Sequence, residues 1–509
     1  MALMLDGTIG TRMDTIIIGG GIGGLCAAIG LAARGVRVRL IERNDEVGGK
    51  LHRWCRDGFT FDTGPHVLTM PWAFDSALAP TGLRLTDIVD LVSLDVVCRY
   101  HLPGPDAGFL DAYSDPVLAA EEIERCFPGE RDGFLKFLDY AARVSDATTE
   151  PFLKRDFGAS VKGMPSREQW GQLGAFIGLK PWCSLRQVVE SKFRDPTLRQ
   201  IFELYALYSG SHPARVSGIF ATVADVQWRQ GTFYIPGGLY TLASALLNVA
   251  LELGVSVETG VGVTEVLIKG GRACGIVTDK GMRLQADTVV CNADFFTASN
   301  TLIPAQIKGH WSEERLSGVD PSTSAFLLLL GVAGTYPSLA HHNCFLSEDP
   351  ECEYSAIVRD GVPSETPTIG VACQSATDPG VAPEGASNLF VMTNPPALSH
   401  NFDWNVERDR YRDLVIAKLE ANGLTDLGRR IRVEQVWTPL DLQSRYGAFR
   451  GAIYGQSSNG WKQGFLRPPN VSADIRGLYF VGGSTHPGGG MPLCALSGAS
   501  VARTITGTS

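Results

Sequence analysis

Glycines near the start of the chain have the spacing of a phosphate-binding turn. Gly19, Gly21 and Gly24 form G-x-G-x-x-G, and Gly23 lies between the last two. The first glycine allows a tight turn, the second lets a pyrophosphate approach the backbone, and the third lets a helix pack on a strand. Backbone N–H groups at the start of the following helix would then bind the phosphates. Because glycines also make ordinary turns, the motif needs support from its surroundings.

The flanking residues supply the elements that this turn requires. Residues 15–18 are an apolar, β-branched run typical of a buried parallel strand. Residues 25–34 are rich in Ala and Leu, as a helix should be, and residues 36–41 predict a second strand. Glu42 closes that strand about 20 residues after the glycines, where an acid binds ribose hydroxyls. The context predicts a dinucleotide-binding βαβ unit.

The residues after Glu42 favour FAD over NAD. Arg43 follows, and the turn then ends in Gly48, Gly49 and Lys50. A Gly-Gly-basic turn behind the ribose acid resembles the glutathione-reductase-like FAD proteins, especially their amine-oxidase and carotenoid-desaturase branch. NAD dehydrogenases have no standing need for such a turn, so the resemblance implies FAD.

Two more segments resemble flavin motifs of the same branch. Residues 57–66 read D-G-F-T-F-D-T-G-P-H, close to a segment that runs along the flavin in bacterial-type phytoene desaturases. Residues 477–492 read G-L-Y-F-V-G-G-S-T-H-P-G-G-G-M-P, a buried strand and glycines before a helix. Backbone groups near Val263 are expected to meet the adenine. The resemblance implies the following cofactor-binding residues: Gly19, Gly21, Gly23, Gly24, Glu42, Arg43, Gly49, Lys50, Gly64, Pro65, His66, Val263, Gly482, Gly483, Gly490 and Met491.

The resemblance also divides the chain of 509 residues, whose length predicts two or three domains. We expect an α/β fold with a glutathione-reductase-like Rossmann FAD-binding domain formed by residues 13–75, 232–298 and 470–509. Residues 76–231 would form a helical subdomain, and residues 299–469 a sheet-containing part of a discontinuous α+β substrate domain. Within the helical subdomain, residues 152–182 mix aromatic side chains with Lys and Arg. That mixture is expected either in a subdomain core or on a surface that contacts membrane.

Composition limits the function classes. The net charge of −9 and the lack of a basic run give no support for nucleic-acid binding. The 11 cysteines contain no C-x-x-C pair, which indicates reduced thiols in a cytoplasmic protein. The first residues lack the pattern of a signal peptide, and no run approaches the ~18 apolar residues of a membrane span. We therefore expect a cytoplasmic protein that lies on a membrane without crossing it.

The sequence offers no obvious catalytic set besides the cofactor. It has no serine–histidine–acid set, no motif of paired carboxylates and no metal cluster. Adjacent His341 and His342 would point to opposite faces of a strand, so we expect no metal. The resemblance implies desaturation, in which a hydride passes to the flavin and a proton leaves the neighbouring carbon. His66 and His486 could accept that proton, or could be hydrogen-bond partners of the flavin or backbone. The catalytic residue stays unassigned.

The tail motif refines the substrate class. Its form G-G-S-x-H-P-G-x-G-x-P most resembles the hydroxy- and methoxy-carotenoid 3,4-desaturases, which implies a long apolar carotenoid substrate, a membrane surface, and quinone or O2 as electron acceptor. A phytoene desaturase, a related carotenoid oxygenase or ketolase, an amine oxidase and a non-catalytic flavoprotein that carries a carotenoid remain alternatives. A hydroxylated chain end would need a hydrogen-bond partner. The candidates are Tyr454, Gln456, Ser457, Ser458 and Asn459.

Overall fold

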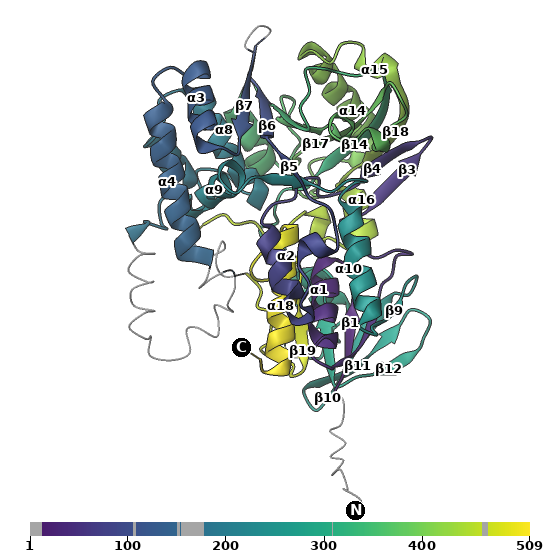
Figure 1. The fold of residues 1–509 in the computed structure, drawn as a ribbon. Helices are drawn as coiled ribbons and strands as arrows, with labels where there is room; N and C mark the ends of the chain where they lie inside the picture. Colours follow the sequence, from purple (N-terminus) through teal and green to yellow (C-terminus); the bar gives the residue numbers. More distant parts are fainter. Residues whose placement is uncertain are drawn as a thin grey trace, which may run out of the picture.

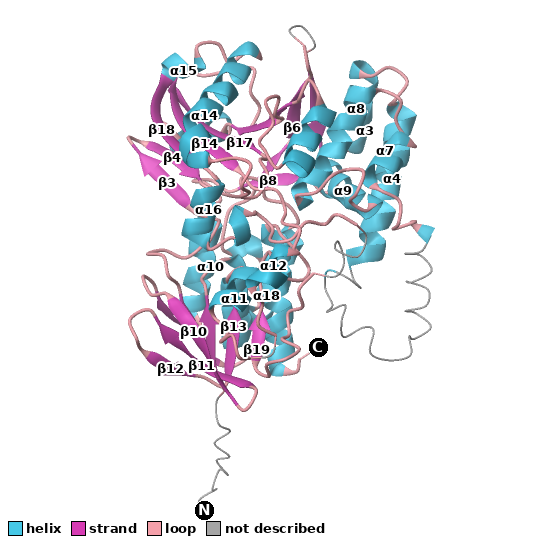
Figure 2. Ribbon diagram, turned by 180° about the vertical axis from the view of Figure 1, so that it is seen from behind, coloured by secondary structure: helices cyan, strands magenta, loops and turns pink. Residues whose placement is uncertain are grey.

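The computed structural model describes residues 13–104, 108–149, 153, 178–307, 309–460 and 467–508. These residues form two lobes that lie one above the other in Figure 1. The lower lobe holds both ends of the described chain and the glycine motifs. The upper lobe has a group of helices on one side and a large sheet with its own helices on the other (Figures 1 and 2).

A five-stranded parallel sheet is the centre of the lower lobe. Its strands come from three distant stretches of the chain, and the predicted βαβ unit provides the middle. The apolar, β-branched sequence of the central strand is buried from its second residue to its last. In spatial order the strands are β19 (Leu478–Phe480), β13 (Thr288–Cys291), β1 (Asp14–Ile18), β2 (Arg37–Ile41) and β9 (Ser256–Glu258).

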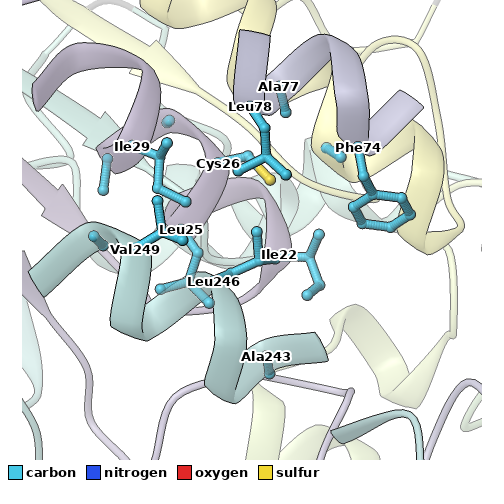
Figure 3. Packing of buried hydrophobic residues seen from close by; sticks show 14 of the residues in the cluster. Ile22, Leu25, Cys26, Ile29, Phe74, Ala77, Leu78, Ala243, Leu246 and Val249 are labelled. Atoms are coloured by element: carbon cyan, nitrogen blue, oxygen red, sulfur yellow. The ribbon is translucent and has the colours of Figure 1, made fainter. Parts of the chain in front are cut away.

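Helices pack against this sheet and bury the first glycine motif. Nearly all of α1 (Ile22–Ala32) is buried, as an almost wholly apolar helix should be. Its neighbours are α2 (Pro71–Leu78), α10 (Tyr240–Glu252) and α18 (Met491–Thr506). Figure 3 shows side chains of α1 between those of α2 and α10. The contact with α18 is close because Gly498 lacks a side chain: a Cβ there would lie 2.4 Å from the carbonyl oxygen of Gly23.

Smaller elements complete the lower lobe and connect it to the upper one. An antiparallel sheet of three strands follows β9. A hairpin leads from the Gly-Gly-Lys turn towards the upper lobe. These elements are β10 (Val263–Lys269), β11 (Arg272–Thr278), β12 (Arg283–Gln285), α11 (Phe295–Thr301), α12 (Glu313–Ser317), and the hairpin of β3 (Arg53–Arg56) and β4 (Phe59–Asp62).

A mixed sheet of seven strands forms the core of the upper lobe. Its order is β18 (Ile431–Trp437), β14 (Phe326–Ala333), β17 (Ala386–Thr393), β16 (Ile369–Ala372), β15 (His342–Phe345), β6 (Val96–His101) and β7 (Phe109–Tyr113). The apolar strand β14 is almost wholly buried and lies in the interior of the sheet. Helices of this part are α13 (Pro350–Ser355), α14 (Trp404–Ala421), α15 (Leu427–Arg430) and α16 (Pro439–Tyr446).

The stretch 76–231 is less helical than expected. It provides α3 (Pro116–Cys126), α4 (Arg131–Thr148), α7 (Leu185–Glu190), α8 (Pro196–Glu203) and α9 (Thr222–Trp228), which share an aromatic core. It also provides β6 and β7 of the large sheet, and β5 (Val92–Leu94), which pairs with β8 (Thr232–Tyr234). The difference arises because β6 pairs with β15, more than 200 residues further along the chain. Local helical spacing carries no information about such a partner.

Three further expectations concern membranes and cysteines. Within the described residues, no helix is both long and apolar enough to cross a membrane. Most of the mixed aromatic and basic stretch 152–182 lies outside the described residues; at its end, Trp182 is 62% exposed. None of the 11 cysteines is paired in a disulfide in the structure.

Candidate active site

The glycines between β1 and α1 form a cradle that fits a phosphate. Gly19 has a φ of +94°, which glycine adopts readily, and its N–H donates to the carbonyl of Ile41 at 2.7 Å. Gly21 begins α1 in extended conformation, no side chain caps the helix, and its first turn has no acid. The free N–H groups and the positive end of the helix therefore suit an anionic ligand.

Asn292, at the end of β13, fills the space beside these glycines. Its Nδ2 donates to the carbonyl of Gly19 at 3.2 Å. A Cβ at Gly21 would lie 2.8 Å from that Nδ2, and a Cβ at Gly23 would lie 2.7 Å from Oδ1. A Cβ at Gly482 would also lie 2.7 Å from Oδ1, so Asn292 joins the first glycine motif to the tail motif. Sequence reasoning missed this residue, although C-N-A-D directly after a strand was a usable signal.

The predicted ribose acid and adenine segment are brought together. Glu42 is buried, and its carboxylate accepts from the N–H groups of Gly20 at 2.7 Å and Asn44 at 2.8 Å. Because an ionised carboxylate has about four acceptor positions, this carboxylate keeps capacity for hydroxyl groups. The backbone of Glu42 pairs with Glu258 and Val261, which places Val263 just beyond it at the start of β10.

Arg43 lies differently from its neighbours. Its side chain is exposed and donates to the carbonyl of Ser444, near the end of α16, at 2.9 Å. The Arg43 side chain is thus engaged by a residue about 400 positions further along the chain.

The Gly-Gly-Lys turn and the segment after β4 run side by side. The N–H of Gly48 donates to the carbonyl of Gly20 at 2.8 Å, and a Cβ at Gly49 would lie 3.2 Å from the Cα of Gly21. A Cβ at Gly64 would lie only 1.9 Å from the carbonyl oxygen of Lys50, so glycine is required there. Gly64 therefore lies beside the Gly-Gly-Lys turn, and Pro65 and His66 follow it in the chain.

Lys50 and Asp294 place opposite charges in the site. The Lys50 ammonium donates to the carbonyl of Ile453. Burial lowers its pKa, and the charge of Asp294 opposes that shift. Burial raises the pKa of Asp294, whereas the Lys50 charge lowers it. Asp294 also caps α11, accepting from the N–H groups of Phe296 at 3.1 Å and Thr297 at 3.2 Å.

The tail glycines form the third wall of the site. Gly482 and Gly490 have φ values of +101° and +110°, which favour glycine, and Met491 begins α18 directly after them. A Cβ at Gly483 would lie 3.7 Å from the Sγ of Cys494, in the first turn of α18. The Tyr454 ring lies against the same turn, because a Cβ at Gly489 would be 2.1 Å from its Cδ1.

The two candidate histidines have different surroundings. The His66 ring lies 4.6 Å from that of Phe390 and 5.5 Å from that of His342, measured between centroids. Burial, and to a lesser extent His342, lowers the pKa of His66 to about 3. The imidazole is therefore neutral at pH 7 and a weak base. His486 is buried, and its backbone is held by Pro468 at 3.0 Å and by Asn470 at 2.9 Å.

The expectation that His341 and His342 point apart is wrong. Their ring centroids are 4.6 Å apart in edge-to-face contact, because His341 precedes β15 and is outside its alternation. Nε2 of His342 lies 3.0 Å from the carbonyl oxygen of His66. Burial lowers the pKa of both side chains, that of His341 to about 2. In the part of the chain that the structure describes, no His, Cys, Asp and Glu side chains are grouped to hold a metal.

Most of the predicted donors for a substrate hydroxyl are already used. Ser457 Oγ and Asn459 Nδ2 both donate to Asp320, at 2.8 and 3.0 Å. Ser458 Oγ accepts from Arg467 at 3.1 Å. The hydroxyl of Tyr454 has no hydrogen-bond partner among the described residues, and burial raises its pKa to about 12, so it is a protonated donor. Gln456 also has an interaction partner. Of the five candidates, Tyr454 is thus the one whose side-chain hydroxyl has no hydrogen-bond partner among the described residues.

Comparisons with known proteins agree with this geometry. Residues 22–506 match the family described as flavin containing amine oxidoreductase. The chain is 35% identical over 491 residues to 4,4'-diapolycopene oxygenase of Methylomonas sp, covering 96% of both chains. It is 32% identical over 502 residues to 4,4'-diaponeurosporene oxygenase of Staphylococcus aureus strain USA300, covering 96% of this chain and 97% of that one. An oxidoreductase from Methanosarcina mazei has the same fold, with a TM-score of 0.62, 19% identity, and coverage of 96% of this chain and 100% of that one.

Proposed function

The chain belongs to the flavin containing amine oxidoreductase family and is an FAD-dependent oxidoreductase, and from this premise we propose that it oxygenates a long apolar polyene. The predicted family resemblance and the predicted cofactor are confirmed at this level. The proposal goes further, to a carotenoid of the 4,4'-diapo type. The observation that carries it is identity of 35% and 32%, along nearly the whole chain, to two oxygenases named for such substrates.

The residues of the site suit this chemistry. When bound, FAD supplies the redox chemistry. The glycine cradle would hold the pyrophosphate, and Glu42 the ribose. Lys50 and the segment from Gly64 to His66 would position the flavin beside the substrate. Conversion of a terminal methyl group to an aldehyde by one O2 releases one water, so this reaction balances without an added reductant.

Tyr454 is the residue that we propose recognises the oxidised end of the chain. Its ring lies against Gly489 of the tail motif, and its hydroxyl is free to donate. A hydrocarbon end needs no such donor, but a product or intermediate with a terminal oxygen does, because a buried unpaired oxygen costs roughly 1–3 kcal/mol.

The experiment that tests this function uses the purified enzyme loaded with FAD. It receives 4,4'-diapolycopene, phytoene or a 1-hydroxylated carotenoid in separate reactions under ¹⁸O₂, and mass spectrometry identifies the products. We expect ¹⁸O in the product of 4,4'-diapolycopene. A new double bond in the hydroxylated carotenoid, with no ¹⁸O in any product, would contradict oxygenation.

A 3,4-desaturase is the second candidate, and the form of the tail motif favours it. The same feeding experiment separates the two functions, since desaturation adds no oxygen. Conversion of phytoene alone would instead support a phytoene desaturase.

We also propose that the protein lies on a membrane surface, where so insoluble a substrate would be found. The exposed Trp182, at the end of the aromatic and basic stretch 152–182, supports this proposal. Changing Lys154, Lys162 and Lys180 to Glu should weaken cosedimentation with anionic vesicles; the first two positions lie outside the described residues. Unchanged cosedimentation of the triple variant would count against this surface.

A further inference from the structure

Arg467 is a buried cation with no carboxylate partner in the described part of the chain. The residue is only 9% exposed. The guanidinium donates to the carbonyl of Tyr454 at 3.0 Å and to Ser458 Oγ at 3.1 Å, and both acceptors are neutral. Burial lowers its pKa to about 10, so the group still carries its charge at neutral pH.

The charges around Arg467 do not balance. Arg467 and Lys50 both act electrostatically on Cys494, in the first turn of α18. Burial raises the pKa of that thiol to about 11, and the neighbouring Tyr454 phenol titrates at about 12, so both are neutral. Among the described residues, Asp294 is the carboxylate whose charge raises the pKa of Lys50. Two cations against one carboxylate leave one positive charge, to which the N-terminal end of the 16-residue α18 adds.

Burying such a charge is costly unless something compensates it. The position of Arg467 indicates where the compensating group would lie. A Cβ at Gly488 would be 3.2 Å from Nε of Arg467, so the cation lies against the tail glycines. The helix N-terminus that suits the pyrophosphate is instead that of α1, where Gly23 lies beside Asn292 and Gly482.

We propose that Arg467 is the electrostatic partner of the negative charge that FAD gains on reduction. A hydride brings two electrons and one proton to oxidised FAD, so the reduced cofactor carries one more negative charge, and the substrate carbon loses the same two electrons. The site has one uncompensated positive charge, which would balance the one negative charge that FAD gains. Arg467 thereby makes FAD a stronger oxidant without contacting the substrate.

Sulfite binding tests the proposal, since sulfite adds to oxidised flavin and leaves the flavin negatively charged. FAD-loaded wild type, Arg467→Met and Arg467→Lys are titrated anaerobically with sulfite, and Arg432→Met, an exposed arginine on β18, controls for net charge. We expect the Kd for sulfite to rise about tenfold or more in Arg467→Met, matched by a midpoint potential about 30 mV lower. Arg467→Lys should retain most of the wild-type affinity, and Arg432→Met all of it. Wild-type sulfite affinity in Arg467→Met would overturn the proposal.

A second measurement tests the proposal if the variant does not retain its cofactor. If Arg467→Met folds but does not retain FAD, its apoprotein is titrated with oxidised and with reduced FAD. The proposal requires a larger loss of affinity for the reduced form. An equal loss for both forms would mean that Arg467 binds the pyrophosphate, and would refute it. Neither titration uses a polyene, so the result is independent of whether the protein is an oxygenase.

Discussion

Gly21→Ala separates the role of this glycine in packing from its role in FAD binding. The backbone of Gly21 is extended, so alanine adds no conformational strain. Its Cβ would lie 2.8 Å from Nδ2 of Asn292, against 3.4 Å or more for an ordinary contact, and no other atom is closer than 3.9 Å. Overpacking of this kind costs roughly 1–3 kcal/mol. If that clash were the only consequence, removing the Asn292 side chain would relieve it.

The assay therefore compares Gly21→Ala with and without Asn292→Ala. Urea unfolding of the apoprotein should show a loss of roughly 1–3 kcal/mol in Gly21→Ala and partial recovery in the double variant. FAD affinity, from quenching of flavin fluorescence, should stay at least about tenfold weaker in both, which corresponds to about 1.4 kcal/mol. The reason is that the Cβ still occupies the space that a pyrophosphate needs.

Gly24→Ala is the matched control for this pair. Its Cβ would lie 2.2 Å from the carbonyl oxygen of Gly19, a backbone atom that Asn292→Ala leaves in place. Asn292→Ala should therefore fail to recover its stability. If FAD affinity returns together with stability in Gly21→Ala/Asn292→Ala, the pyrophosphate does not approach Gly21 and our assignment of the cradle is wrong.

Two further predictions address pH dependence and substrate recognition. Burial raises the pKa of Glu353 from 4.5 to about 7, so its ionisation destabilises the fold increasingly as pH rises between those values. In urea unfolding, the free energy of unfolding of Glu353→Gln relative to wild type should rise by about 3 kcal/mol between pH 4.5 and pH 8. Exposed Glu384→Gln is the control. A difference between Glu353→Gln and wild type that stays constant with pH would contradict the raised pKa of Glu353. Tyr454→Phe should weaken binding of a polyene with an oxidised end about tenfold and leave the parent hydrocarbon nearly unaffected, measured as KM. Equal losses for both substrates would show that the ring, not the hydroxyl, matters.

The parts of the fold that were predictable are those encoded by neighbouring residues. The βαβ unit around Gly19 and the strand–glycine–helix unit before Met491 each combine a short apolar run with glycines at fixed spacing. The pairing of β6 with β15 could not be predicted in this way. It joins strands from distant stretches, and only burial in the folded sheet distinguishes β6 from its helical surroundings.

The site residues differ in the same way: some could be predicted from neighbouring residues, and others could not. Lys50 could be proposed because it follows two glycines at a recognisable place. Asn292 and Arg467 could not, because each has its role through segments far away in the chain. Asn292 fills the space beside Gly21 and Gly482, and Arg467 is significant only because Asp294 leaves one of two cations unpaired. A charge imbalance is a property of the assembled site, and no single stretch of sequence contains it.

The electrostatics of the site also constrain how a proton can leave the substrate. His66 has a pKa of about 3, so it is too weak a base to retain a proton at neutral pH. Burial raises the pKa of Asp294 and the Lys50 charge opposes that rise, but the Asp294 carboxylate already accepts from two backbone N–H groups. Among the described residues of the cradle, a strong and free base is therefore missing. Positive charge from Arg467 and Lys50 instead promotes electron transfer to FAD. We infer that neither candidate reaction, oxygenation or desaturation, relies on a strong base from these side chains when a proton leaves the polyene.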